Sequence, residues 1–239
     1  MFRIGTAGWS IPRQYAGRFP AEGTSLERFA GRFSAAEINS SFHRPHRPAT
    51  WERWRDSVPA NFRFSVKVPK EITHQRKLID PAEPLERFID QARLLGNKLA
   101  VLLVQLPPKL AFDAAVACEF FTALIARSSG RIACEPRHPS WFGPDADEML
   151  ARLNIARVAA DPAPCPAAAV PDTWSGLAYF RLHGSPKMYR SPYGERVHDY
   201  ADELKRALDS GREAWCIFDN TASSAAMGDA LALMDELSS

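Results

Sequence analysis

The stretch Arg131–Trp141 is unusually dense in side chains that can do chemistry. A short apolar run ends there in a carboxylate, a guanidinium, an imidazole and an indole. Charged groups are costly to bury, and where apolar strands end in them they commonly form the floor of a pocket. The four side chains are those of Glu135, Arg137, His138 and Trp141.

Polar residues two positions apart follow or end other apolar runs as well. Side chains along a strand alternate between its two faces, so residues two apart point to the same side. If one member of a pair points into a pocket, the other does too. The pairs are Glu37 and Asn39, Glu135 and Arg137, and Arg181 and His183.

The elements that must position these pairs are short apolar runs, most of them separated by stretches with a helical pattern. Regular strand–helix alternation favours parallel βα units. The first run has no Gly-x-Gly-x-x-Gly after it, which argues against a doubly wound dinucleotide-binding sheet. The expected strands cover residues 2–7, 35–38, 62–68, 99–106, 131–135, 156–160, 177–182 and 215–218.

Eight βα units in about 250 residues are typical of a TIM-type (β/α)₈ barrel. We therefore expect an α/β fold with a single, slightly irregular barrel domain over residues 1–239 and long βα loops. In such barrels the functional site lies at the C-terminal ends of the strands. The paired polar residues would then converge on one mouth, where buried charges must pair with one another.

We assign candidate roles at this mouth by residue type. Carboxylates and imidazoles can exchange protons, whereas guanidinium, ammonium, amide and indole groups bind and orient ligands. The expected catalytic residues are Glu37, Glu135, His183 and His74. The expected substrate-binding residues are Asn39, Lys67, Arg137, His138, Trp141, Arg181, Asn220 and Trp9.

Each assignment has a structural alternative. Carboxylate–guanidinium pairs can fill a barrel mouth without any chemistry. His138 can hydrogen-bond a loop, and Trp9 and Trp141 can cap the barrel core. The small hydroxyl residues after Asn220 suit an ordinary helix N-cap, or a phosphate site at a helix N-terminus.

The composition excludes several classes of protein. Hydrophobic residues make up 46% and charged residues 24%, as in ordinary globular proteins, and the net charge is +2. That charge does not indicate nucleic acid as a partner, and no run approaches the length of a membrane span, so we expect no membrane association. Four cysteines without a Cys-x-x-Cys pair predict reduced thiols and a cytoplasmic location. The oligomeric state stays open.

The chain resembles the domain-of-unknown-function family number 72, the YecE-like family. The motifs that carry the resemblance span nearly the whole chain, and they imply a TIM-barrel fold without implying an activity. Small departures are Ala7 in place of a common Ser, Tyr15 in place of Trp, and Asp219 in place of a frequent Asn. The matching stretches are residues 5–10, 37–43 with Pro45, 51–54, 64–67, 72–74, 135–141, 181–184 and 218–220.

The mouth favours an enzyme, a hydrolase or lyase, that acts on a polar, anionic or phosphorylated small molecule. Glu37 or Glu135 would serve as the general acid or base. A metal-dependent phosphoesterase acting on nucleic acid is one alternative, with Asp161, His138 and His183 among its ligands. A non-catalytic protein that binds an anion or nucleic acid is another. Because cations are as numerous as carboxylates, we assign no metal ligand, and the cofactor stays open.

Overall fold

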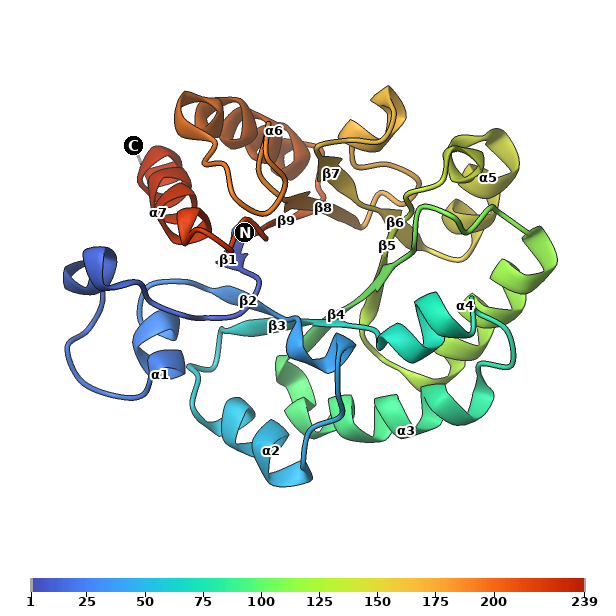
Figure 1. Ribbon diagram of the computed structural model, residues 1–239, viewed down its shortest axis with the longest axis horizontal. Coiled ribbons are helices and arrows are strands. Elements are labelled where there is room, and N and C mark those ends of the chain that lie inside the picture. Colours follow the sequence, from blue (N-terminus) through green and yellow to red (C-terminus); the bar gives the residue numbers. More distant parts are fainter. Residues whose placement is uncertain (1, 239) are drawn as a thin grey trace.

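The computed structural model describes residues 2–238 and places the strands in an inner ring with the helices outside them (Figure 1). All the strand pairs are parallel. The strands are β1 (Phe2–Thr6), β2 (Ala35–Ile38), β3 (Arg63–Lys67), β4 (Leu99–Gln105), β5 (Arg131–Glu135), β6 (Ile155–Arg157), β7 (Ala159–Asp161), β8 (Leu177–Leu182) and β9 (Glu213–Phe218).

Helices connect most successive strands. Within residues 2–238, no helix has the length and apolar character needed to cross a membrane. The α-helices are α1 (Ser25–Ala30), α2 (Pro48–Asp56), α3 (Ala82–Ala92), α4 (Ala114–Arg127), α5 (Pro144–Arg152), α6 (Val197–Asp209) and α7 (Ala225–Ser238).

The strands form two parallel sheets that meet at two seams. The first sheet has the order β1-β9-β8-β7 and the second β2-β3-β4-β5-β6. At one seam Ala7 bridges Glu37, and the Gly8 amide donates to the Glu37 carbonyl at 2.8 Å. At the other seam only Val158 separates β6 from β7, and its amide donates to the Cys134 carbonyl at 2.8 Å. The strands thus occupy eight positions of a TIM-type barrel, as expected, with the sixth position split in two.

The strands are buried on both faces, which explains their continuous apolar sequences. Their inward side chains form one apolar cluster, which combines the large rings of Tyr179 and Trp215 with small residues such as Ala133. Their outward side chains pack against the helices in a second, larger cluster. Following the inward positions toward the C-terminal strand ends leads from this apolar interior to the charged residues.

The connection between β7 and β8 departs from the strand–helix pattern. It is rich in proline and contains only the 3-10 turn Pro166–Ala169. Proline lacks the amide hydrogen that an α-helix interior needs, so this loop cannot supply a covering helix. The long connections over the mouth agree with the irregular barrel expected from the sequence.

Candidate active site at the barrel mouth

Arg181 is the centre of the charged cluster at the C-terminal strand ends. Its side chain has no exposed surface. Its Nε and Nη2 donate to the two carboxylate oxygens of Glu37 at 2.9 and 2.8 Å. Its Nη1 donates to Glu135 Oε2 at 3.1 Å, and its Nη2 lies 2.9 Å from Asp219 Oδ2. One guanidinium therefore holds three carboxylates from three different strand ends.

His183 lies between two of these carboxylates. Its Nδ1 is 3.0 Å from Asp219 Oδ2, and its Nε2 is 3.0 Å from Glu135 Oε1. Arg137 donates to Glu135, and its Nη2 is 2.6 Å from His183 Nε2. A protonated ring would donate to both carboxylates, whereas a neutral ring would donate to Asp219 and accept from Arg137.

The cluster favours the ionised forms of Glu135 and Asp219. Burial by itself raises the pKa of Glu135, but the surrounding cations, Arg137 first, hold that pKa well below its ordinary value. Burial likewise opposes ionisation of Asp219, and Arg181 overcomes it, so the pKa of Asp219 is also lowered. Burial would lower the pKa of Arg181, but its three carboxylates raise that pKa well above the ordinary value.

A cavity of about 420 Å³ opens above the cluster. Arg137, His74 and Gln105 line it with polar groups, and the Gln105 amide donates to Glu135 Oε1 at 3.1 Å. Tyr189 adds an aromatic wall, and its ring stands at 90° to the ring of His183. The other lining residues are mostly apolar: Leu106, Pro107, Pro108, Pro162, Ala163, Pro164 and Met188.

Lys67 adds an ammonium at the end of β3. The residue is 6% exposed, and its Nζ lies 4.1 Å from the centre of the Phe42 ring. Within residues 2–238 it forms no ion pair, and burial and then Arg181 lower its pKa. His74 packs edge-on against the same ring, and burial, Lys67 and Lys70 lower its pKa. His74 is therefore mostly neutral at pH 7.

A family model that spans nearly the whole chain identifies its family. The family model described as "Protein of unknown function DUF72" matches residues 3–239. The chain belongs to the DUF72 family. UPF0759 protein YecE of Escherichia coli K12 is 27% identical over 173 residues, which cover 70% of this chain and 62% of the relative. UPF0759 protein YunF of Bacillus subtilis 168 is 30% identical over 153 residues, which cover 60% of this chain and 53% of the relative.

A solved DUF72 structure has the same fold. The crystal structure of a DUF72 family protein from Thermotoga maritima matches with a TM-score of 0.83 at 23% identity, and the match covers 100% of both chains. At this identity the likeness concerns the fold alone. The matched part of this DUF72 chain corresponds to 53–62% of the length of the two curated relatives.

Six of the residues predicted for the mouth of this DUF72 barrel meet in the charged cluster or border it, and His74 lines the cavity above. Period-two alternation brought them to one side, because each lies on or just beyond a strand. The six are Glu37, Lys67, Glu135, Arg137, Arg181 and His183.

Asn220 and Trp141 do not lie at the mouth, contrary to expectation. Asn220 is buried, and its Nδ2 donates to the Ser191 carbonyl at 2.9 Å and to Asp229 Oδ2 at 2.7 Å. Trp141 is buried as well, and its indole donates to the Leu110 carbonyl at 3.0 Å. Both side chains hold loops in place.

Three other predicted residues also lie elsewhere. His138 precedes the turn Pro139–Phe142, and its Nδ1 accepts a hydrogen bond from the Ser140 amide at 3.2 Å. Trp9 packs edge-on against Trp54 and lines a separate cavity of about 130 Å³. Asn39 starts the turn Ser40–Phe42, and its side-chain carbonyl oxygen is buried without a hydrogen-bond partner. None of the three lines the mouth cavity.

Asp219 is a charged residue of the cluster that does not belong to the expected site residues. The alternation in β9 contains the signal, because Trp215 and Ile217 face the barrel interior and residue 219 continues their series. Asn220 lies one position further and so turns to the opposite side. The same rule that found the other strand ends therefore selects Asp219 rather than Asn220.

Of the five possible metal ligands, Glu37, Glu135 and His183 meet around Arg181, whereas Asp161 and His138 lie elsewhere. Asp161 accepts hydrogen bonds from Arg196 and Tyr200, and His138 caps its own turn. In the described part of the chain, no group of three or more His, Cys, Asp or Glu side chains has a geometry that could hold a metal ion.

Proposed function

We propose that this DUF72 chain is an enzyme that binds a small anionic or phosphorylated substrate at the barrel mouth and acts on it by general acid–base chemistry, as a hydrolase or lyase. The observation that supports this proposal is that the carboxylates of the mouth are buried, whereas a guanidinium is accessible. Glu37 and Glu135 are wholly buried, and both form ion pairs with Arg181. The polar groups that reach the cavity are one cation, Arg137, and the uncharged side chains of His74, Gln105 and Tyr189.

Arg137 is the group best placed to hold the substrate anion. It lines the cavity, and Glu135 and His183 fix its guanidinium from below. A guanidinium held in this way can offer its remaining N–H groups to a carboxylate or phosphate without first losing conformational freedom. Lys67 borders the same charged cluster, although it does not line the cavity. Tyr189 and the proline walls would contact the rest of the substrate.

His74 is the proton carrier in this proposal. It lines the cavity, and its lowered pKa leaves it mostly neutral at pH 7, so its imidazole can accept a proton there. The Thr73 hydroxyl, 2.8 Å from His74 Nδ1, orients the ring. Glu37, Glu135 and His183 then act as positioning residues that hold the guanidinium groups.

The first test is the binding of inorganic phosphate, measured by isothermal titration calorimetry. We expect wild-type protein to bind phosphate, and Arg137→Gln to weaken binding about tenfold or more, since a charge-assisted hydrogen bond contributes about 1.5–3 kcal/mol. Arg93→Gln is the matched control, because Arg93 is exposed and precedes β4 at the opposite end of the barrel. Equal affinity in all three proteins would rule out the mouth as the anion site.

The second test is turnover of a panel of phosphate monoesters and carboxylate esters. We expect the wild type to turn over at least one of them, and His74→Gln to lower kcat by about 10²-fold or more with a smaller change in KM. Unchanged kcat in His74→Gln would remove His74 from the proton-transfer role.

A protein that binds the anion without turning it over is the second candidate. The observation that favours it is that Glu37, Glu135 and Asp219 are all engaged in ion pairs. Phosphate binding that depends on Arg137, together with no turnover across the whole panel, would select this candidate.

A further inference from the structure

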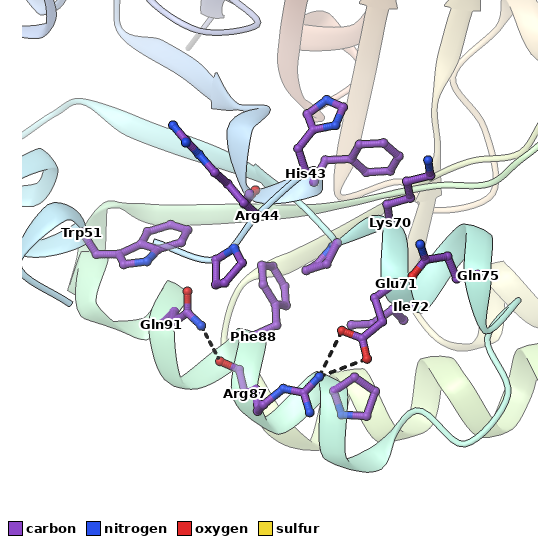
Figure 2. Close-up of a pocket in the computed structure, with 15 residues that line it drawn as sticks. His43, Arg44, Trp51, Lys70, Glu71, Ile72, Gln75, Arg87, Phe88 and Gln91 are labelled. Carbon is purple, nitrogen blue, oxygen red and sulfur yellow. Dashed lines mark hydrogen bonds and ion pairs between the residues drawn. The ribbon is translucent and has the colours of Figure 1, made fainter. Parts of the chain in front are cut away.

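A second cavity, of about 330 Å³, lies outside the barrel. Its walls come from α2, α3 and the segments that follow β2 and β3 (Figure 2). Phe88 occupies the centre of the view, while Arg44 and Lys70 extend at the rim (Figure 2). A volume of this size is within the range of small-molecule sites.

Trp51 supplies an unpartnered donor on the wall of this cavity. The residue is 1% exposed, and its indole Nε1 is buried with no hydrogen-bond partner. Figure 2 shows the ring at one side of the cavity, with its nitrogen on the edge nearest Gln91. An unsatisfied buried donor costs about 1–3 kcal/mol, so native proteins rarely leave one without a reason. A ligand acceptor in the cavity would satisfy it.

The cavity also carries uncompensated positive charge. Its one lining carboxylate, Glu71, is engaged by Arg87 at 3.0 Å and by Arg76 at 3.3 Å. Arg44 and Lys70 are exposed and form no ion pair within residues 2–238. An anion at the rim would therefore meet two free cations.

Phe42 separates this cavity from the barrel mouth. Its ring lines the second cavity. The Lys67 ammonium and the His74 ring both pack against the same Phe42 ring. None of the residues that line the second cavity lines the mouth cavity. The two are separate sites: Phe42 lines the second cavity, and His74, which packs against the Phe42 ring, lines the mouth cavity.

We propose that this second cavity binds a small organic anion with an aromatic body. The aromatic body packs against Phe88, the anionic group reaches Arg44 and Lys70, and an oxygen of the ligand accepts the Trp51 N–H. The apolar floor and the charged rim together select against both inorganic anions and neutral aromatic compounds.

The test follows the Trp51 indole N–H signal in ¹⁵N-labelled protein during titration with phenyl phosphate, and the Trp51→Phe variant assigns that signal. We expect a saturable downfield shift, because the free donor gains an acceptor. Inorganic phosphate and phenol, which each lack one half of the ligand, should move the signal much less. The shift should persist in Arg137→Gln, so failure of the mouth as an anion site leaves this outcome unchanged.

Charge-neutralising variants give the second measurement. Arg44→Gln combined with Lys70→Gln should weaken phenyl phosphate binding at this signal about tenfold or more. Arg47→Gln is the matched control, since Arg47 is exposed on the same segment and does not line the cavity. A stationary Trp51 signal, undiminished affinity in the double variant, or an equal loss in Arg47→Gln would each overturn the proposal.

Discussion

At the scale of the residue, the mouth is organised by a guanidinium that is wholly buried. Arg181 could not be buried alone, because a desolvated charge costs several kcal/mol. Glu37, Glu135 and Asp219 remove that cost by surrounding it. The carboxylates in turn depend on Arg181, so the cluster is stable only as a unit.

Replacing Arg181 should therefore be severe. We expect Arg181→Met to lower the free energy of unfolding by about 3–5 kcal/mol, because it leaves buried carboxylates without their shared cation. Urea unfolding followed by tryptophan fluorescence measures this loss. Arg206→Met removes an exposed pair with Glu203 and should leave stability nearly unchanged. Similar losses of stability in the two variants would contradict the mutual dependence of Arg181 and its three carboxylates.

The same carboxylates set the response of stability to acid. The pKa values of Glu135 and Asp219 are lowered in the folded protein, while in the unfolded chain they take ordinary values of about 4. Their contribution is present above the unfolded values and is lost as pH falls toward the folded ones. Urea titrations between about pH 5 and 3 should show falling stability, with a shallower slope in Glu135→Gln. Equal slopes would show that Glu135 does not titrate in this way.

Alternation along strands predicted the centre of the cluster, because Glu37, Glu135 and Arg181 lie within strands, where direction follows from position. It also placed Arg137 and His183, which lie just beyond their strands, but it did not place the residues where the chain turns. His138 and Trp141 lie where the chain turns, and there tertiary contacts such as the Trp141–Leu110 bond decide direction. Asn220 lies away from the mouth because the inward series of β9, Trp215 and Ile217, continues at Asp219.

At the scale of the element, the close approach of β1 and β2 requires a residue without a side chain, Gly5. A Cβ on Gly5 would lie 1.9 Å from the Ala35 carbonyl oxygen. Only glycine lets the two strands approach so closely, and the Ala7–Glu37 bridge next to it joins the two sheets. This bridge also holds the backbone of Glu37, so the seam helps to position the site.

Gly5→Ala should open this seam. Because the clash is with backbone rather than with a flexible side chain, we expect a loss of about 1–3 kcal/mol or more in the free energy of unfolding. Hydrogen exchange should also show weaker protection of the Gly8 amide, which donates to Glu37. In Gly17→Ala, where no atom lies within 4 Å of the added carbon, both readouts should stay near wild type. Unchanged Gly8 protection in Gly5→Ala would argue against a tight seam.

The strand pattern predicted all eight barrel positions, since apolar runs bounded by polar residues persist wherever both faces are buried. It could not predict the break at Val158. There the Arg157 amide donates to the Asp172 carbonyl at 3.0 Å, so a loop distant in sequence competes with the neighbouring strand. This contact forms only in the folded protein, so the sequence around Val158 contains no pattern that would predict the break.

At the scale of the whole molecule, the C-terminal end of the barrel buries its carboxylates and leaves a guanidinium, that of Arg137, facing the cavity. The carboxylates lie underneath, and Arg137 and His74 face a cavity of about 420 Å³ whose other walls are mostly apolar. That division is the reason to expect an anionic ligand there. The cavity beside Phe42 would take a ligand of different chemistry, because its floor is aromatic and its cations are exposed.

The most direct test of the mouth as an anion site is a crystal structure of the protein soaked in tungstate, a heavy analogue of phosphate. We predict strong anomalous density in the mouth cavity within hydrogen-bond distance of Arg137, and loss of that density in Arg137→Gln crystals. An empty mouth at saturating tungstate, or density that persists unchanged in Arg137→Gln, would contradict the account.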